Sequence, residues 1–275
     1  MFGWPVWAHF TVNSFYPNGA NLMRNRYIEK IKQALRPPIY KLLFKSQQQF
    51  VCPICGYEGP FLDKRISRVP DLVRSNSKCL GCASNERHRM MHLVVNKLFS
   101  SWDPGGKSLL HIAPEDCLTT ELNSKFAIYH TADLLMENVD FNEDIQAMSF
   151  PNDSYDCLVV SRVLTIPPDL DASLTEIRRV LKPNGIAIVA EIFKHDEILE
   201  FGEMINFRSR EIGIDLINRL EEHFSQVECY LSDRFSSSYQ LANTMKLNGK
   251  PQDDFPEKVR IKNVGFMEMV LVCHV

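Results

Sequence analysis

The sequence predicts an α/β fold in which the strands of a parallel sheet alternate with helices. Residues 155–161 form a short apolar run behind a Pro-Asn-Asp-Ser turn, as expected of a strand buried on both faces. Residues 171–181 place apolar side chains at the spacing of an amphipathic helix. After the turn at residues 183–185, residues 186–193 form a second, β-branched run. A strand, a helix and a strand in this order make two parallel strands joined by a right-handed crossover.

Two motifs in this unit resemble those of class I S-adenosylmethionine-dependent methyltransferases of the type 11-like branch. Residues 150–156 read FPNDSYD, similar to the family pattern lpFpdnsfDvv, and residues 176–185 read EIRRVLKPNG, similar to EirRVLkPgG. The resemblance implies a Rossmann-like, seven-stranded mixed sheet, S-adenosylmethionine as the cofactor and methyl transfer as the reaction. After a helix over residues 216–224, the last two strands are expected at residues 226–232 and 266–274, the final one inserted antiparallel.

Charge divides the 275 residues into a basic front and an acidic remainder. The first 100 residues hold 15 Lys and Arg against 5 Asp and Glu, whereas the other 175 hold 16 against 29. A basic front indicates contact with nucleic acid, an anionic membrane surface or a phosphorylated substrate, or else a solvated face docked on the acidic domain. No apolar run approaches the roughly 20 residues needed to span a bilayer, and no secretory signal is recognisable, so we expect a cytoplasmic protein.

The chain divides into three regions. Residues 1–48 combine an aromatic arm, expected to pack or to join subunits of a homo-oligomer, with a basic helix over residues 22–35. That helix is expected to be a linker packed on the domain, with binding at a membrane surface as the alternative. Residues 49–100 hold a zinc ribbon and a connecting helix, and residues 101–275 hold the methyltransferase domain. Within the last region, the polar residues 233–264 are expected to form loops that cover the active site.

Four cysteines predict a metal site in the second region. Cys52 and Cys55 form one C-x2-C pair, and Cys79 and Cys82 form another after 23 intervening residues. Four thiolates at this spacing close a tetrahedron around Zn²⁺, and iron is the alternative ion. Because a closed set of four ligands leaves no open position for substrate, we expect a structural metal in a reducing compartment.

The residues after the second cysteine pair extend the resemblance. Residues 83–89 read ASNERHR, similar to CgSlERHR, which follows the zinc ribbon in a subset of bacterial class I methyltransferases often encoded among polysaccharide or natural-product genes. Arg87, His88 and Arg89 open a helix that continues to Leu98. These three residues are expected either to offer donors to an anionic substrate group or to pair with carboxylates.

The first strand of the main sheet, residues 107–113, leads into an unusual loop. Class I methyltransferases usually have an acidic residue and a glycine-rich turn here, whereas this chain has His111 and then Ala113, Pro114 and Glu115. The zinc-ribbon subset shows the same LLHIAPE pattern. The resemblance places these four residues at the cofactor, with Glu115 near its amino group, and a helix N-terminal position is the alternative interpretation of Glu115.

The other expected cofactor residues follow the next strands. Asp133, at the end of the second strand, is expected to accept hydrogen bonds from the ribose hydroxyls, with Leu134 beside it. Capping of a turn is the alternative role for this carboxylate. Asp144 and Ile145 match the pair that binds adenine in the family, and Ser161 ends the fourth strand.

Catalytic candidates come from loops near the transferred methyl group. Relatives commonly have HVLEHI after the fourth strand, and Arg162 replaces the first histidine of that pattern. Residues 201–216 resemble fGqpdHvRvYg.Df and retain its arginine as Arg208. Arg162 and Arg208 are therefore candidates, with His111 and His195 as candidate bases. Alignment of an already electrophilic methyl group supplies much of the rate even without a base.

We expect a methyltransferase acting on a small-molecule, natural-product or glycan-type acceptor. One alternative is an RNA-binding or RNA-modifying protein that uses the basic ribbon, but residues 60–90 offer only Phe61 for stacking on bases. Another alternative is a domain that binds the cofactor without transferring its methyl group. The sequence determines neither the acceptor atom nor the oligomeric state.

Overall fold

The computed structural model describes residues 38, 40–66 and 69–275. The predicted aromatic arm and basic helix, and with them the predicted subunit contact, lie outside the described residues. In the part of the chain that the structure describes, no helix is long and apolar enough to cross a bilayer.

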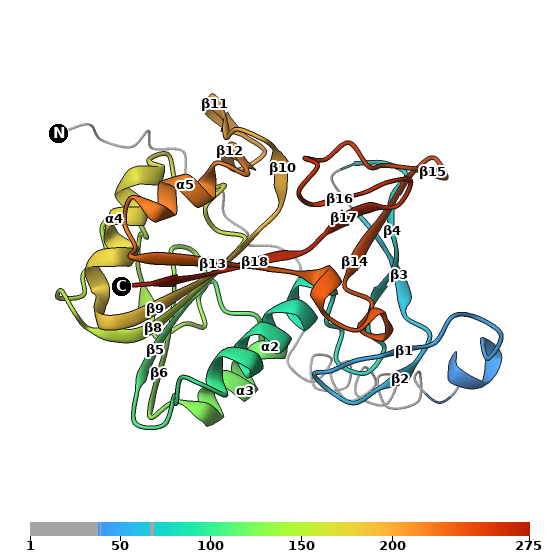
Figure 1. Cartoon of the computed structure of the whole chain (residues 1–275), viewed down its shortest axis with the longest axis horizontal. Helices are drawn as coiled ribbons and strands as arrows, with labels where there is room; N and C mark the ends of the chain where they lie inside the picture. Colours follow the sequence, from blue (N-terminus) through green and yellow to red (C-terminus); the bar gives the residue numbers. More distant parts are fainter. Residues whose placement is uncertain (1–37, 39, 67–68) are drawn as a thin grey trace, which may run out of the picture.

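A seven-stranded mixed sheet forms the centre of the larger lobe (Figure 1). Its spatial order is β7-β6-β5-β8-β9-β18-β13, in which β18 runs antiparallel to both neighbours and the other pairings are parallel. The strands are β5 (Ser108–Ile112), β6 (Ile128–Asp133), β7 (Phe141–Asn142), β8 (Tyr155–Ser161), β9 (Leu181–Glu191), β13 (Gln226–Leu231) and β18 (Met269–His274). The predicted seven-stranded sheet with its last strand inserted antiparallel is confirmed.

Strand β9 begins at residue 181, earlier than the predicted residue 186, so the turn expected at residues 183–185 lies inside the strand. Tyr155 of β8 pairs with Leu181, and the register shifts before Cys157 pairs with Ile186. Within this shift, Asn184 adopts a left-handed conformation with a φ of 63°. The extra residues therefore form an irregularity in the ladder, as in a bulge, and the chain does not leave the sheet.

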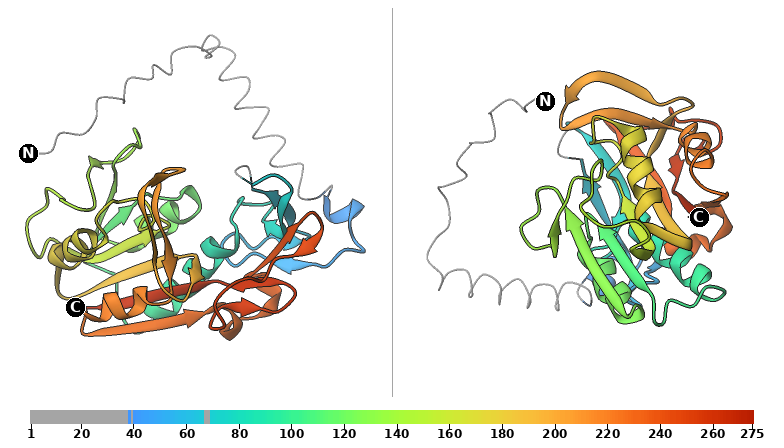
Figure 2. Two further views of the ribbon diagram at one scale, coloured as in Figure 1. Left: turned by 90° about the horizontal axis from the view of Figure 1, so that it is seen from above. Right: turned by 90° about the vertical axis from the view of Figure 1, so that its left-hand side faces the viewer.

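Helices cover both faces of this sheet (Figures 1 and 2). On one face lie α2 (Glu86–Phe99) and α3 (Asp116–Lys125), and on the other lie α4 (Leu170–Val180) and α5 (Leu216–Glu221). Alternate side chains of β8 serve the two faces, since Cys157 and Val159 pack with α2 and α3 while Leu158 and Val160 pack with α4 and α5. Burial on both faces explains why the sequence of this strand is continuously apolar.

A second sheet joins segments that lie far apart in the sequence (Figure 1). Strand β4 pairs antiparallel with β3 on one side and with β14 on the other, and β17 and β16 continue beyond β14. The strands are β3 (Leu62–Arg65), β4 (Leu72–Lys78), β14 (Ala242–Leu247), β15 (Lys250–Pro251), β16 (Arg260–Ile261) and β17 (Gly265–Met267). The prediction of loops over residues 233–264 is therefore wrong. Within these residues, β14 pairs with the open edge of β4, whose backbone N–H and C=O groups require partners.

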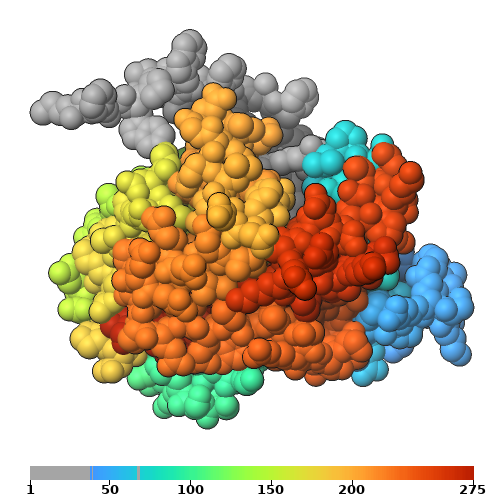
Figure 3. All heavy atoms as spheres, turned by 45° about the horizontal axis from the view of Figure 1, so that its top comes forward, coloured from blue at the N-terminus to red at the C-terminus, as the bar shows by residue number. Residues whose placement is uncertain are grey.

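A smaller sheet carries a hairpin that stands out from the molecular surface (Figure 3). It consists of β10 (Phe193–His195), β12 (Arg208–Gly213) and β11 (Leu199–Ile205), with β12 in the middle. Arg210 on β12 is 1% exposed and donates hydrogen bonds to the carbonyl oxygens of Leu164 and Pro167 at 2.9 and 2.6 Å. These bonds tie the hairpin to the loop that follows β8.

Candidate active site and four-cysteine centre

The carboxyl ends of β5, β6 and β8 meet at one edge of the central sheet, because β5 pairs in parallel with both neighbours. Directly after β5, Ala113 has a φ of 51°, and its N–H donates to the carbonyl oxygen of Ala132 at 2.8 Å. This left-handed conformation is the one that glycine adopts at least cost. The bend expected of a glycine-rich loop is therefore present although the residue is alanine.

Glu115 begins α3 from this loop and collects polar partners from several elements. Its Oε1 accepts a hydrogen bond from Ser161 Oγ at 3.0 Å and lies 2.9 Å from Arg87 Nη2. Its Oε2 is buried and has no hydrogen-bond partner among the described residues. Burial would raise the pKa of Glu115, but the nearby imidazoles of His111 and His88 and the charge of Arg87 hold it well below its usual range. Glu115 is therefore a buried carboxylate with one oxygen available to a donor.

His111 supports Glu115 from the interior of the sheet. Its side chain is fully buried, with Nδ1 2.9 Å from the Tyr129 hydroxyl and Nε2 3.8 Å from Glu115 Oε2. The other candidate base, His195, is 40% exposed on its side chain, and its Nε2 lies 2.8 Å from Glu211 Oε2. Both histidines thus have polar partners within the protein.

Asp133 ends β6 and caps the turn that follows. Its Oδ1 accepts hydrogen bonds from the backbone N–H groups of Leu135 and Met136 at 2.7 and 2.8 Å. Its Oδ2 makes no hydrogen bond to any described residue. Leu134, the expected neighbour of the ribose, is 52% exposed. Asp133 therefore combines the turn-capping alternative with an oxygen that remains open to a ligand.

Asp144 is more fully engaged than Asp133. Its Oδ1 accepts from the Gln146 backbone N–H and from Gln146 Nε2, both at 3.0 Å, and its Oδ2 lies 3.1 Å from Nε2. The neighbouring Ile145 is buried in the core cluster that includes α4. The structure therefore uses both Asp144 oxygens within one local turn.

Arg162 occupies the place where relatives have histidine. It adopts a left-handed φ of 61°, and its Nη2 donates to both carboxylate oxygens of Glu268 at 2.9 and 2.7 Å. The Nε and Nη1 atoms of this side chain are buried and have no partner among the described residues. Arg162 is therefore a cation held in place by the segment that enters β18, with donors to spare.

A cavity of about 470 Å³ opens beside Arg162, and we call it the cationic cavity. It is lined by Lys64, Arg65, Ile66, Arg87, Arg162, Thr165, Ile166, Phe207 and Arg208. A smaller cavity of about 110 Å³ shares Arg87, Arg162, Thr165 and Arg208 with it and adds the buried Glu191. Burial raises the pKa of Glu191. Sequence reasoning missed Lys64, Arg65 and Glu191, because only the fold brings β3 and the end of β9 to this place.

Residues 86–89, which read ERHR, include both buried structural residues and a residue that lines the cationic cavity. Glu86 is fully buried and accepts from Ser77 Oγ at 2.8 Å, and burial raises its pKa. Arg89 is also fully buried, and its guanidinium donates to the carbonyl oxygens of Ser77, Ser84 and Tyr239, each at 2.9 Å. Arg87 pairs with Glu115 and lines the cavity, whereas Arg89 donates hydrogen bonds to carbonyl oxygens of both the cysteine region and the second sheet.

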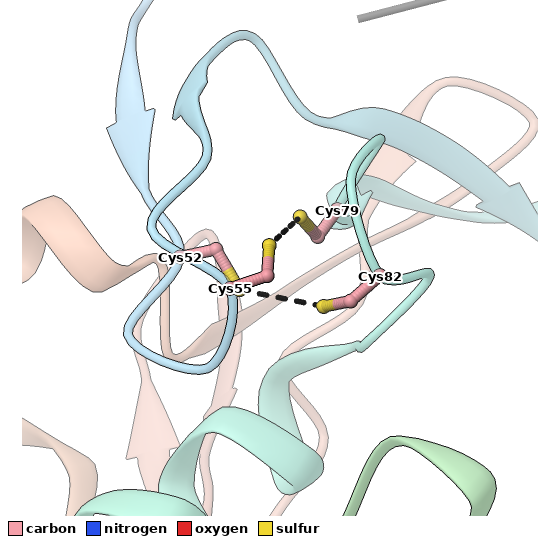
Figure 4. A group of neighbouring side chains, drawn as sticks. All are labelled: Cys52, Cys55, Cys79 and Cys82. Carbon is pink, nitrogen blue, oxygen red and sulfur yellow. Dashed lines mark hydrogen bonds between the residues drawn. The ribbon is translucent and has the colours of Figure 1, made fainter. Parts of the chain in front are cut away.

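The four cysteines come together at the turn after β1 (Phe50–Val51) and the turn after β4 (Figure 4). The sulfurs of Cys52 and Cys82 lie 3.6 Å apart, those of Cys55 and Cys79 lie 3.7 Å apart, and all four lie within 4.8 Å of one another. Sulfurs bound tetrahedrally to Zn²⁺ at about 2.3 Å are about 3.8 Å apart. We call this group the cysteine cluster, and its geometry matches the predicted ligand set.

Gly81 explains how the second turn approaches the sulfurs so closely. A Cβ atom on Gly81 would lie 2.8 Å from Cys55 Sγ, and the Gly81 N–H donates to Cys79 Sγ at 3.3 Å. A side chain at this position would therefore displace a ligand. Strand β2 (Glu58–Gly59) pairs antiparallel with β1, so Cys52 and Cys55 lie in the connection between these two strands.

The family described as Methyltransferase domain matches residues 106–189, which run from the start of β5 through most of β9. The chain contains a methyltransferase domain. The strand order with antiparallel β18 identifies the fold as that of a class I methyltransferase. In the methyltransferase domain, the matched residues include Glu115, Asp133 and Ser161, so the polar edge described above belongs to the family's own segment.

Two fungal synthetases are similar to this chain over short stretches. A polyketide synthase-nonribosomal peptide synthetase of Aspergillus clavatus is 28% identical over 130 residues, which are 44% of this chain and 3% of that protein. The hybrid PKS-NRPS synthetase xenE of Xenoacremonium sinensis is 40% identical over 63 residues, or 23% of this chain and 2% of that protein. The chain thus spans only a few per cent of the length of these curated relatives.

Solved structures of methyltransferases cover a larger share of the chain at low identity. A SAM-dependent methyltransferase from Archaeoglobus fulgidus is 10% identical, covers 70% of this chain and 96% of its own, and has a TM-score of 0.46. The N-methyltransferase NodS from Bradyrhizobium japonicum WM9, in complex with S-adenosylhomocysteine, is 16% identical, covers 68% and 86%, and has a TM-score of 0.42. The family assignment rests on the matched residues and the strand order.

Proposed function

We propose that the protein is an S-adenosylmethionine-dependent methyltransferase whose cofactor lies along the carboxyl edge of β5, β6 and β8. The observation that carries this proposal is the set of polar groups at that edge. Glu115, Asp133 and Ser161 follow three adjacent strands, within the residues that match the methyltransferase family. Ligands of open α/β sheets bind at this end of the strands.

The unpartnered acceptors at this edge fit the donors of S-adenosylmethionine. Glu115 Oε2 is a buried carboxylate oxygen without a partner in the described chain, which suits the cofactor's ammonium group. Asp133 Oδ2 is open to a ribose hydroxyl while Oδ1 holds its turn. Ile145 would pack on the adenine, whereas Asp144 would accept the adenine amino group only by releasing Gln146.

The other predicted cofactor residues would shape the site without carrying charge. Ala113 and Pro114 form the bend that lets the chain pass close to the methionine part, and Leu134 covers the ribose side. His111 would orient Glu115 from behind, because its own nitrogens face Tyr129 and Glu115. We assign His111 a positioning role and no proton transfer.

S-adenosylmethionine, when bound, supplies an electrophilic methyl group; the acceptor atom forms the new bond to it, and the S–CH₃ bond breaks to leave S-adenosylhomocysteine. An acceptor that carries a proton at that atom also releases one proton. Arg162 and Arg208 line the adjoining cavity, so their expected role is to hold the acceptor in line with the methyl group. Positioning of this kind requires no general base.

A small natural-product or glycan-type acceptor fits the site better than a large one. The cationic cavity measures about 470 Å³, within the range of small-molecule pockets. The curated relatives named above are synthetases of polyketides and nonribosomal peptides. Both observations support an acceptor of this class.

We further propose that the cysteine cluster binds a structural Zn²⁺. The four sulfurs already lie close to tetrahedral spacing, and Gly81 keeps the space around Cys55 free. Strand β4, which ends just before Cys79, belongs to the second sheet and pairs there with β14. A metal bound to the cysteine cluster would therefore order both cysteine turns and this sheet. Thiolate ligands of this kind persist in a reducing compartment, which supports a cytoplasmic location.

The test of the proposed activity is calorimetric titration with S-adenosylmethionine and, separately, S-adenosylhomocysteine. Micromolar binding of both, with much weaker binding of adenosine at the same concentrations, is the expected result. Adenosine is the matched control because it has the same nucleoside but lacks the ammonium group from which Glu115 would accept a hydrogen bond. A folded, metal-loaded sample that binds neither ligand would contradict the proposal.

A further inference from the structure

The cationic cavity is lined by cations from separate parts of the chain. Among the residues that the structure describes, nine line it, of which five are Lys or Arg and none is acidic. Lys64 and Arg65 come from β3, Arg87 from α2, Arg162 from the loop after β8, and Arg208 from β12. Like charges gathered in this way repel one another, so an anion bound among them would be stabilising.

Several of these cations lack partners within the described residues. Lys64, Arg65 and Arg208 make no side-chain hydrogen bond or salt bridge there. Lys64 is half-buried, and burial together with the charges of Arg74 and Arg87 lowers its pKa. An ordinary surface lysine extends into water or pairs with a carboxylate. Lys64 has no carboxylate partner in the described chain, so its ammonium group is available to a ligand.

The two tethered arginines keep donors in reserve. Arg162 uses Nη2 on Glu268 and Arg87 uses Nη2 on Glu115, while Nε of each and Nη1 of Arg162 have no partner in the described chain. Their acidic partners therefore fix the positions of the two side chains without saturating them. Guanidinium groups held in this way suit an oxyanion with several acceptor oxygens. Glu115 and Glu268 already pair with two of the five cations, and a phosphate or diphosphate matches the charge of the other three better than a single carboxylate does.

The cavity adjoins the proposed cofactor edge. Arg87 contacts Glu115, and Arg162 directly follows Ser161, whose hydroxyl donates to the same Glu115. Phe207 stands at the rim, 78% exposed and with a left-handed φ of 61°, a conformation that a bulky residue adopts only at a cost. An exposed aromatic ring at such a position offers a face to the uncharged part of an acceptor.

We propose that the acceptor is a small molecule carrying a phosphate or diphosphate group, which the cationic cavity binds beside the methyl donor. This inference rests on the proposed methyl transfer. A small phosphorylated molecule is favoured over nucleic acid, because proteins that bind single strands stack successive bases on several aromatic side chains. Phe207 is the one aromatic residue that the described part of the chain contributes to the lining.

The test is titration of inorganic pyrophosphate into the protein with and without saturating S-adenosylhomocysteine, at an ionic strength held constant with sodium chloride. The wild type is expected to bind pyrophosphate in both states. Arg208→Ala and Lys64→Ala should each weaken pyrophosphate binding about tenfold, as expected when one charge-assisted contact is lost. Both variants should bind S-adenosylhomocysteine as the wild type does. Lys262→Ala, which removes an exposed lysine outside the cavity, is the matched control and should bind like the wild type.

Four outcomes would overturn the inference. The wild type binds no pyrophosphate in either state, or Lys262→Ala weakens binding as much as the cavity variants do. Pyrophosphate displaces S-adenosylhomocysteine one for one, which would assign the cations to the cofactor's own carboxylate. A single-stranded oligoribonucleotide depends on Arg208 and Lys64 while pyrophosphate does not, which would favour nucleic acid. If S-adenosylhomocysteine fails to bind the wild type, the proposed function fails on its own, and the pyrophosphate titration still decides whether the cavity is an anion site.

Discussion

The proposed cofactor edge and the cationic cavity are neighbours, but they are built in different ways. Glu115, Asp133 and Ser161 follow adjacent strands within residues 106–189 and match a family pattern. The cavity draws its cations from β3, α2, the loop after β8 and β12, which span most of the chain. The proposed cofactor edge is local to one end of the central sheet. The cationic cavity forms only where the second sheet packs against the methyltransferase domain.

The difference shows how a common fold acquires a particular acceptor. The cofactor edge can be shared by any chain with this sheet, because parallel strands always present their carboxyl ends together. The cavity needs the β3–β4 hairpin to be held against the methyltransferase domain. Here β14 pairs with β4 and then β17 leads into β18, so the second sheet is continuous with the central one along the chain. The sheet that carries the cysteine cluster thus also contributes β3 to the cationic cavity.

Removal of the cysteine cluster should have the largest effect, because it should disrupt the cationic cavity more than the proposed cofactor edge. In Cys52→Ser/Cys55→Ser we expect loss of one metal ion per chain and unfolding of the β3–β4 hairpin. Structural zinc contributes on the order of 10 kcal/mol to small metal-binding folds. Metal analysis and thermal unfolding measure both effects. Cys229→Ser, which alters a cysteine outside the cluster, should retain the metal. A metal-free wild type would refute the zinc assignment.

Two buried arginines, Arg89 and Arg210, should each stabilise a different region of the molecule. Arg89 binds carbonyl oxygens around the cysteine region and Arg210 binds those of the loop after β8, and both are almost fully buried. Arg89→Met and Arg210→Met should each lower the free energy of unfolding by about 2–4 kcal/mol, because buried carbonyls lose their donors. Limited proteolysis should then show cleavage near residues 77–84 in the first variant and near residues 164–168 in the second. Identical cleavage patterns in the two variants would contradict the prediction that the two arginines stabilise different regions.

The central sheet could be predicted from the sequence because its strands are buried on both faces. Residues 155–161 are apolar throughout, and β8 lies there as predicted. Strand β14, by contrast, reads ANTMKL, and its partner β4 lies in the first third of the chain, so no local pattern reveals the pairing. In the same way, the family motif predicted Arg208 as a candidate site residue. The hydrogen bonds from Arg210 to three backbone carbonyl oxygens could be recognised only in three dimensions.

The two aspartates of the cofactor edge should respond unequally. Asp133 keeps one oxygen open, whereas both oxygens of Asp144 are bound by Gln146. Asp133→Ala should weaken S-adenosylhomocysteine binding about tenfold or more, since hydrogen bonds to charged groups contribute about 1.5–3 kcal/mol. Asp144→Ala should have the smaller effect by calorimetry. The ribose assignment fails if Asp133→Ala binds as tightly as the wild type.

Two glycines of the cysteine region should show the smallest and most local effects. Gly81→Ala should lower metal affinity, because the added Cβ would lie 2.8 Å from Cys55 Sγ. At Gly56 no atom lies within 4 Å of the added Cβ, and only the left-handed φ of 71° is unfavourable, at a cost of about 1 kcal/mol. Gly56→Ala should therefore lower stability slightly and leave metal affinity unchanged. Competition with a chromogenic chelator distinguishes the two, and equal metal loss in both variants would contradict this account of the cluster.

We propose that the cofactor lies at the carboxyl edge of β5 and β6, with the acceptor beside it in the cationic cavity. Hydrogen–deuterium exchange with and without S-adenosylhomocysteine tests this most directly in the intact protein. We predict slower exchange in peptides that cover residues 113–116 and 133–136, and unchanged exchange in those that cover residues 62–66. Protection confined to residues 62–66 and 207–208 would place the cofactor in the cationic cavity and contradict the account.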